Sequence, residues 1–367
     1  MGHDVLPLPV FGFVGPSGAG KTALLEELLS LWRQGGWRVG AIKHIHHPRK
    51  DEGPGVDSFR LEAAGAAAVC VAEEEPWDEA LRKLLAREQL DWVVVEGYHG
   101  APLLQFLVLN RGENLPEERQ RARGWILGAV LREKGDPRLF PPSLPIYSAN
   151  EAEALAKAIE AMAAPKPSPF PVAGCILAGG RSRRMGRDKR VLRQAGTTWL
   201  AIAAKALAGA VEGPLFAAGT PPEEDPHPEL TWLPDLRPGE GPLAALYGLA
   251  LRLTSPWLLV VPTDMPFLTK EALYPFLEIL PLGEREGVDA FLPKLKDGWQ
   301  PMPGLYRREA LLRALSLLAG GERSLHSWRI RQKVWALPEE TWRKQGIDPE
   351  KVFMDVDDEV TRQQRLP

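Results

Sequence analysis

The sequence contains few cysteines, few asparagines and no long hydrophobic run. Of its 367 residues only Cys70 and Cys175 are cysteines, too few for a disulfide framework or a cysteine-based zinc site and typical of a reducing compartment. No run approaches the roughly 18 apolar residues that a membrane-spanning helix needs. The first residues carry no basic segment ahead of an apolar one, so we expect no signal peptide and a cytoplasmic protein.

The chain also lacks an excess of either charge. Its 45 Lys and Arg residues against 48 Asp and Glu residues give a net charge of −3. This balance argues against a protein that binds nucleic acid over its whole surface, so any anion site must be local. The hydrophobic share is 44% and the charged share 25%, which is typical of a globular protein. The length suggests two or three domains.

Proline marks the clearest boundary. Residues 163–171 read Ala-Ala-Pro-Lys-Pro-Ser-Pro-Phe-Pro, and such a segment cannot continue a helix or lie in a central strand. We expect a short, extended and semi-rigid linker there. The predicted organisation is a first domain at 1–163, a linker at 164–171 and a second domain at 172–367.

Both halves open with an apolar strand, a glycine-rich turn and a helix. In the first half we expect strands at 10–14, 38–43, 68–72, 92–96, 105–109, 126–130 and 145–148, and helices at 23–32, 58–64, 78–88 and 151–162. In the second half we expect strands at 173–177, 214–218, 257–261, 290–292 and 334–337, and helices at 199–208, 243–253, 270–278 and 308–319. This alternation predicts two α/β domains, each a mostly parallel sheet between helices, with ligands at the carboxyl ends of the strands.

The turn of the first half is a complete phosphate-binding motif. Gly15-Pro-Ser-Gly-Ala-Gly-Lys-Thr22 matches G-x-x-x-x-G-K-[ST] between a strand and a helix, the context that the motif requires. Lys21 would reach the terminal phosphates of a nucleotide and Thr22 would bind Mg²⁺. The other contacts would come from the backbone amides of the loop, at Gly15, Ser17, Gly18, Ala19 and Gly20.

Two further features lie at predicted strand ends in this half. Glu96 ends an apolar strand, where an acid would hold or orient the Mg²⁺ shell, although it could instead cap the loop. His44, His46 and His47 follow the second strand. A zinc site is one interpretation of the three histidines; we favour polar lining of a ligand cleft, because no cysteine or carboxylate completes a ligand set.

The first half resembles the molybdopterin-guanine dinucleotide biosynthesis adaptor family, MobB. The resemblance rests on the motif at 15–22, on Ile42-Lys-His-Ile-His-His47, on Gly55-Val-Asp-Ser-Phe-Arg60, on Ala64-Gly-Ala66 and on Val95-Glu-Gly-Tyr98. It implies a P-loop that binds GTP and a domain that assists a guanylyltransferase. His99 departs from the family, which often has lysine at about this position, so a phosphate contact there is in doubt.

The glycine-rich turn of the second half differs from a P-loop. Leu177-Ala-Gly-Gly-Arg-Ser-Arg-Arg-Met-Gly-Arg-Asp-Lys189 has no Gly-Lys-Thr before a helix and resembles the signature of nucleotidyltransferases. This chemistry depends on placement and charge neutralisation at the α-phosphate. Arg184 and Lys189 are the best candidates for that charge, whereas Arg181, Arg183 and Arg187 fit a charged surface.

Two carboxylates complete the predicted second site. Asp264 ends an apolar strand between Pro262 and Pro266; we expect these prolines to exclude regular strand pairing there and to expose a carboxylate for Mg²⁺, a cap on the next turn being the alternative. Asp235 begins a loop that leads through Gly241-Pro242 into a helix. It could accept a hydrogen bond from a base or ribose, or the segment could be a simple turn.

The second half resembles the molybdenum cofactor guanylyltransferase family, MobA. The resemblance rests on residues 177–189, Gly-Pro-Leu-Ala at 241–244, Pro-Thr-Asp-Met-Pro-Phe-Leu at 262–268, Gln-Pro-Met-Pro-Gly-Leu-Tyr at 300–306 and Phe-Met-Asp-Val-Asp-Asp at 353–358. It implies that Leu177, Ala178 and Gly179, with Gly180 beside them, bind the nucleotide. It further implies that Lys189 binds phosphate, Asp235 contacts the nucleotide and Asp264 holds Mg²⁺.

The chain departs from the MobA family at two places. Asp355 and Asp357 stand where the family usually has asparagines, and a carboxylate cannot donate a hydrogen bond as an amide does. Ala218-Gly-Thr220 replaces a segment that often contains an asparagine, so that base contact would be made otherwise.

Together the motifs predict an N-terminal P-loop NTPase-like domain fused to a C-terminal Rossmann-like nucleotidyltransferase domain, two tandem three-layer α/β domains. The resemblances imply GMP transfer from GTP to molybdenum cofactor, with Mg²⁺, and a first domain that binds GTP. They also imply molybdenum-insertion proteins, molybdoenzyme apoproteins or their chaperones as partners, and a possible homodimer through the first domain. Two alternatives remain at this point: a cytidylyltransferase, and a GTP-dependent carrier without catalysis.

Overall fold

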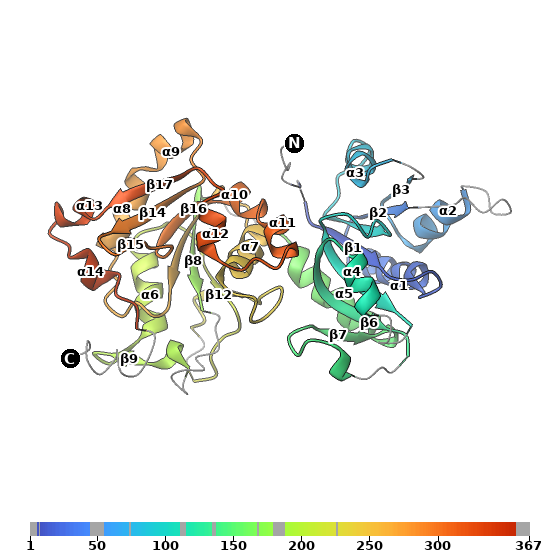
Figure 1. The fold of residues 1–367 in the computed structure, drawn as a ribbon, viewed down its shortest axis with the longest axis horizontal. Coiled ribbons are helices and arrows are strands. Elements are labelled where there is room, and N and C mark those ends of the chain that lie inside the picture. The colour runs from blue at the N-terminus through green and yellow to red at the C-terminus, as the bar shows by residue number, and fades with distance from the viewer. Residues whose placement is uncertain are drawn as a thin grey trace. The chain divides into compact units, whose positions relative to one another are not determined.

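The computed structural model describes residues 6, 8–44, 55–72, 75–110, 115–133, 137–166, 169–178, 188–224 and 227–356. The chain divides into two compact units. The first comprises Met1–Ala164 with Leu315–Glu322, and the second Pro165–Ala314 with Arg323–Pro367. Figure 1 labels the elements of both units.

The first unit is built on a seven-stranded sheet in which every paired strand runs parallel to its neighbours. Its order is β3-β2-β4-β1-β5-β6-β7. The strands are β1 (Val10–Val14), β2 (Val39–His44), β3 (Ala68–Ala72), β4 (Trp92–Glu96), β5 (Leu104–Leu109), β6 (Trp125–Leu131) and β7 (Ile146–Ser148). The helices are α1 (Lys21–Gln34), α2 (Gly55–Ala64), α3 (Trp77–Leu85), α4 (Leu115–Arg121) and α5 (Ala152–Ala163), with short 3₁₀ turns η2 (Pro137–Leu139) and η3 (Ala149–Glu151).

Alternate residues of β4 face helices on opposite sides of this sheet. Val93 and Val95 belong to a buried cluster with Leu81 of α3, whereas the ring of Trp92 meets Trp32 of α1 edge-on at 5.5 Å. Such alternation is expected of a strand. Because both faces are covered, the strand is apolar throughout until Glu96, its last residue.

The second unit contains a mixed sheet of eight strands. Its order is β12-β11-β8-β13-β16-β14-β15, with β17 paired to β14. The strands are β8 (Val172–Leu177), β11 (Leu215–Ala218), β12 (Leu230–Leu233), β13 (Trp257–Pro262), β14 (Ala290–Leu295), β15 (Gly298–Trp299), β16 (Gly304–Arg307) and β17 (Val334–Pro338), and β9 (Arg193–Gln194) and β10 (Thr197–Thr198) form a separate hairpin. The helices are α6 (Trp199–Ala208), α7 (Pro242–Arg252), α8 (Tyr274–Glu278), α9 (Leu280–Glu286), α10 (Arg308–Leu312), α12 (Leu325–Arg329), α13 (Glu340–Arg343) and α14 (Pro349–Val352), with 3₁₀ turns η4 (Lys189–Val191) and η5 (Glu271–Leu273). Helix α11 (Leu315–Ala319), which follows α10 in the chain, belongs to the first unit.

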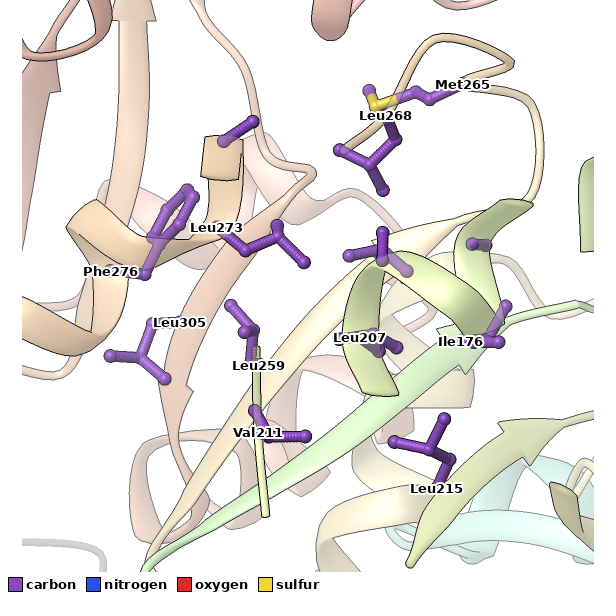
Figure 2. Close-up of a cluster of buried hydrophobic side chains, with 14 of the residues drawn as sticks. Ile176, Leu207, Val211, Leu215, Leu259, Met265, Leu268, Leu273, Phe276 and Leu305 are labelled. Carbon is purple, nitrogen blue, oxygen red and sulfur yellow. The ribbon is translucent and has the colours of Figure 1, made fainter. Parts of the chain in front are cut away.

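A large apolar cluster joins α6 and α8 to the centre of this sheet. Figure 2 shows Ile176 of β8 and Leu259 of β13 in one cluster with Leu207 of α6 and Phe276 of α8. The cluster continues to Met265 and Leu268, which lie just after Asp264. Packing of these two residues therefore fixes the direction in which the chain leaves β13.

The structure confirms most predicted elements and corrects several. The second sheet is mixed, because β16 runs antiparallel to both β13 and β14, whereas the pairs among β8, β11, β12 and β13 are parallel, as expected. Pro262 does not interrupt pairing: it is the last residue of β13 and stands opposite Leu177, where a missing N–H ends a ladder without breaking it. The single helix expected at 308–319 is two, α10 and α11.

The proline-rich segment contacts the second unit at Lys166. The amide of Lys166 donates to the carbonyl of Arg252 at 2.7 Å, and Lys166 forms an isolated parallel bridge with Leu253. This residue of the segment is therefore extended and attached to the second unit. No helix among the described residues is long and apolar enough to cross a membrane.

Candidate functional site

The P-loop of the first unit lies between β1 and α1, as the motif predicts. Gly18 and Gly20 have φ of 76° and 83°, values that favour glycine. Lys21 donates from Nζ to the carbonyl oxygens of Gly15 at 2.9 Å and Pro16 at 2.8 Å. Ser17 and Gly18 are exposed and Ala19 is buried. The ammonium group thus lies over the start of the loop, and burial lowers the pKa of Lys21.

Glu96 contacts the P-loop directly, as expected for an acid at the end of the neighbouring strand. The Thr22 hydroxyl lies 2.9 Å and 3.0 Å from the two carboxylate oxygens of Glu96. Lys43, the second-last residue of β2, contacts both members of this pair, with Nζ 3.2 Å from Thr22 Oγ1 and 3.6 Å from Glu96 Oε2. The sequence interpretation grouped Lys43 with the histidines and missed this contact, although its position at a strand end beside β4 was the available signal.

The histidine segment is described only in part. His44 stacks on the ring of Tyr98, with centroids 4.0 Å apart and planes 19° apart, and the Tyr98 hydroxyl donates to the carbonyl oxygen of Glu75 at 2.7 Å. His46 and His47 lie outside the described residues. His44 thus has an aromatic partner from the loop after β4.

His99 contacts the first glycine of the P-loop. Its Nε2 lies 3.2 Å from the amide nitrogen of Gly15 and 3.2 Å from Oε2 of Glu118. Glu118 belongs to α4, a helix that the sequence interpretation did not identify, so this neighbour of the loop was missed. Burial lowers the pKa of His99, against the opposing effect of Glu118.

In the second unit, the predicted nucleotide-binding turn begins at the carboxyl end of β8. Leu177 and Ala178 are buried, and the Ala178 amide donates to the carbonyl oxygen of Ala218 at 3.2 Å. Gly179, Gly180 and Arg184 lie outside the described residues, so their predicted roles remain predictions. The chain is described again from Asp188, which caps η4 by accepting a hydrogen bond from the Arg190 amide at 3.0 Å.

Lys189 and Asp264 come together although 75 residues separate them in the sequence. Lys189 Nζ lies 3.2 Å from Oδ2 of Asp264, and the two side chains are 17% and 24% exposed. Because β8 and β13 are parallel neighbours, the segments that follow them meet at one edge of the sheet. The pair is therefore accessible at the edge where ligands bind in open α/β sheets.

One other segment of the MobA-like pattern contacts Asp264, and a further one contacts that segment. The amide of Val356 donates to the carbonyl oxygen of Asp264 at 3.0 Å, and Gln300 Nε2 donates to the carbonyl oxygen of Phe353 at 2.8 Å. The Val356 side chain is buried with Leu192 and Trp199. Residues 353–356 therefore connect Asp264 to Gln300. Asp355 is exposed, and Asp357 lies outside the described residues.

Asp235 lies after β12, two strands away from β8 in the sheet order. Its Oδ1 is inaccessible and has no hydrogen-bond partner among the described residues. Burial raises the pKa of Asp235, and the nearby Arg252 guanidinium opposes this effect. Arg252 is itself only 2% exposed, and burial lowers its pKa to about 10. An unsatisfied acceptor at a strand end is suited to a ligand that donates a hydrogen bond.

The loop after Asp235 leads into α7 as predicted. Gly241 caps this helix with φ of 84°, and Pro242 is its first residue. Glu240 forms ion pairs with Arg237 at 2.6 Å and with Arg323.

Among the described residues, no group of three or more His, Cys, Asp or Glu side chains could hold a metal ion.

The fold and the two loops define a P-loop unit joined to a nucleotidyltransferase. Residues 10–127 match the family model "Molybdopterin guanine dinucleotide synthesis protein B", and residues 174–334 match the model "MobA-like NTP transferase domain". The chain therefore belongs to both families, with a MobB part followed by a MobA-like part that makes it a nucleotidyltransferase.

Individual relatives match one part of the chain each. The molybdopterin-guanine dinucleotide biosynthesis adapter protein of Escherichia coli is 35% identical over 125 residues, which is 30% of this chain and 71% of that protein. A probable molybdenum cofactor guanylyltransferase of Synechococcus elongatus is 32% identical over 176 residues, 45% of this chain and 87% of that protein. The structure of molybdopterin-guanine dinucleotide biosynthesis protein A from Archaeoglobus fulgidus aligns with 53% of this chain and 96% of its own, at 22% identity and a TM-score of 0.44.

Proposed function

We propose that the second unit transfers GMP from GTP to the terminal phosphate of Mo-molybdopterin. A phosphate oxygen of the cofactor attacks the α-phosphorus of GTP, the bond from that phosphorus to the β-bridging oxygen breaks, and pyrophosphate leaves. The product is molybdopterin guanine dinucleotide. The observation that carries this proposal is the Lys189–Asp264 pair, formed by the segments that follow the adjacent strands β8 and β13, in a chain with a MobA-like part.

The residues around this pair fit Mg²⁺ bound together with a nucleotide. Mg²⁺ is commonly held by one or two carboxylates plus substrate phosphates, with no dedicated cage of protein ligands. Asp264 would supply one such carboxylate. A Mg²⁺ ion at Asp264 would neutralise phosphate charge.

Lys189 has a separate task in this proposal. Its ammonium group, held beside Asp264, would move to the triphosphate and neutralise charge that develops on the leaving pyrophosphate. Arg184 would act on the same charge, and Leu177, Ala178, Gly179, Gly180 and Asp235 would hold the base and ribose. Val356, through its hydrogen bond to the Asp264 backbone, keeps the carboxylate in place for a metal-bound substrate.

For the first unit we propose a GTP- and Mg²⁺-binding adaptor role. The amides of residues 15–20 and Lys21 would hold the phosphates, and the Thr22 hydroxyl and the Glu96 carboxylate, 2.9 Å apart, would hold the metal. These two oxygen-bearing groups at a P-loop and a neighbouring strand end suit Mg²⁺. The unit would present the cofactor to the transferase or pass the product to molybdoenzyme apoproteins or their chaperones.

The test is dinucleotide formation by the purified chain from Mo-molybdopterin with GTP or with CTP. We expect GTP to be preferred and Asp264→Ala to lower turnover about 100- to 1,000-fold, the effect of removing one transition-state charge contact. The matched variant Lys21→Ala should retain much of the turnover with supplied cofactor. Preferred use of CTP would identify a cytidylyltransferase. Activity that survives Asp264→Ala but not Lys21→Ala would exclude the assignment of catalysis to the second unit.

A further inference from the structure

His99 has no part in the functions proposed above, yet it contacts the P-loop. Its Nε2 lies 3.2 Å from both the Gly15 amide nitrogen and Glu118 Oε2. The first of these groups is a donor and the second an acceptor. A single imidazole nitrogen can accept from one when unprotonated or donate to the other when protonated, but it cannot do both.

Neither proton state satisfies both neighbours. With Nε2 unprotonated, the Gly15 amide has an acceptor, but Glu118 Oε2 is buried without any hydrogen bond among the described residues. With Nε2 protonated, His99 donates to Glu118 and the amide of the loop is released. Leaving a buried acceptor unsatisfied is unfavourable, so the two states compete closely.

The surroundings hold the imidazole in this position. The carbonyl oxygen of His99 accepts from the Arg123 amide at 2.8 Å and from Gln105 Nε2 at 3.4 Å. Glu118 is 2% exposed and accepts from Arg121 at 3.0 Å. Because these contacts hold both the His99 backbone and Glu118 in place, we expect the ring to respond to a new charge nearby by gaining or losing a proton at Nε2 and not by moving away.

The charge of His99 depends on the groups that would meet a nucleotide. Lys21 bonds to the carbonyl oxygen of Gly15, the residue whose amide nitrogen faces His99. The charged groups that act on His99 are Glu118, Arg121 and Lys21, and burial sets its pKa below the ordinary value. Phosphates held by this loop would add negative charge close to the ring and so favour its protonated form.

We propose that His99 and Glu118 link nucleotide binding at the P-loop to the uptake of one proton. The proton comes from solvent and binds Nε2 of an imidazole whose Nδ1 already carries a proton, and the resulting imidazolium donates to Glu118 and releases the Gly15 amide. This inference rests on the proposed binding of GTP by the first unit. It makes His99 a positioning residue that holds the start of the loop in one proton state and frees it in the other.

Calorimetric titration of the full chain with Mg²⁺ and the non-hydrolysable analogue GMPPNP tests the proposal. Titrations in buffers of different ionisation enthalpy give the number of protons taken up, and the binding that Lys21→Ala removes identifies the first unit. We expect uptake of up to one proton with this Lys21-dependent binding. Its Kd should fall by up to about tenfold per unit decrease in pH between the pKa values of His99 in the free and bound protein.

The decisive variant is His99→Gln, because an amide can accept from Gly15 and donate to Glu118 at once without titrating. It should keep Lys21-dependent binding but lose the proton uptake, whereas His326→Gln, a change at an exposed histidine of α12, should lose neither. Glu118→Gln should reduce the uptake. Equal uptake by wild type and His99→Gln, or Lys21-dependent binding without uptake, would overturn the linkage alone. No Lys21-dependent binding at any pH would overturn GTP binding by the first unit as well.

Discussion

At the scale of single residues, the close approach of the Val108 carbonyl oxygen to Gly15 explains why the P-loop begins with glycine. Gly15 has φ of 155°, and a Cβ built on it would lie 1.9 Å from the carbonyl oxygen of Val108 in β5. Gly18, three residues later, has φ of 76° but open space around its Cβ position. The first glycine is therefore required by packing and backbone together, and the second by backbone alone.

We predict that Gly15→Ala destabilises the first unit by roughly 2–5 kcal/mol, because overpacking adds to backbone strain. Gly18→Ala should cost only about 1–2 kcal/mol, the usual effect of an L-residue in the left-handed region. Urea unfolding of the nucleotide-free protein measures both. If both variants lower the free energy of unfolding equally, the close approach of Val108 to Gly15 contributes nothing to the cost of Gly15→Ala.

A second residue-scale prediction concerns the buried Arg252 beside Asp235. Arg252→Met removes the cation whose charge favours the ionised form of Asp235, and the cost should be at most that of breaking a buried ion pair, about 3–5 kcal/mol. Burial raises the pKa of Asp235, so the folded state favours the neutral acid. This preference for the neutral acid stabilises the folded state at low pH, and the stabilisation is lost as the pH rises through the raised pKa of Asp235.

The destabilisation by Arg252→Met should therefore be larger at pH 7 than at pH 4, as measured by the free energy of unfolding at each pH. The double variant Arg252→Met/Asp235→Asn, which removes the charge of the acid, should lose this pH dependence. If Arg252→Met lowers the free energy of unfolding equally at both pH values, the variant acts through packing and not through the charge of Asp235.

At the scale of elements, the segment at 353–356 depends on one side-chain hydrogen bond. We predict that Gln300→Ala, which removes the donor to the Phe353 carbonyl oxygen, destabilises this segment by about 1 kcal/mol. Amide hydrogen exchange of Val356 should become about fivefold faster, since 1.4 kcal/mol corresponds to a factor of ten. Gln345→Ala, at an exposed position, is the control, and equal exchange in both variants would contradict the prediction.

The elements that the sequence predicted correctly are those whose local pattern matches their final environment. The apolar runs of β4 and β8 are buried on both faces of a sheet, so composition alone identified them. Helix α4 was missed because Leu115-Pro-Glu-Glu-Arg-Gln-Arg121 has little apolar periodicity. β12 was missed because it has only four residues and an exposed position at Thr231, as suits an edge strand.

The candidate site was predictable where strand order alone brings residues together. Asp264 and Lys189 both follow strands that are expected to end at the ligand edge, and a motif marked each of them. The His99–Glu118 contact was not predictable, because it depends on the placement of α4 against the loop after β4. The direction of β16 was likewise set by tertiary pairing with β13 and β14 and has no local signal.

At the scale of the whole molecule, the two loops predict two independent nucleotide sites in one chain. Mg²⁺ and GMPPNP should stabilise both units in a thermal unfolding experiment, by about 2.7 kcal/mol each at a hundredfold excess over Kd. Lys21→Ala should remove the shift from one transition and Lys189→Ala from the other. Loss of both shifts through either single variant would show that the chain holds one nucleotide only.

The hydrogen bond between Val356 and Asp264 also constrains how such a fusion can be assembled. Val172, where β8 begins, pairs with Trp257 at the start of β13, so it lies at the edge of the sheet opposite the Lys189–Asp264 pair. A domain added ahead of β8 joins the transferase at the edge away from its chemistry. Val356 lies at the other edge, where its amide holds the Asp264 backbone. A domain that precedes β8, as the P-loop unit does in this chain, is therefore linked to the second unit away from Asp264.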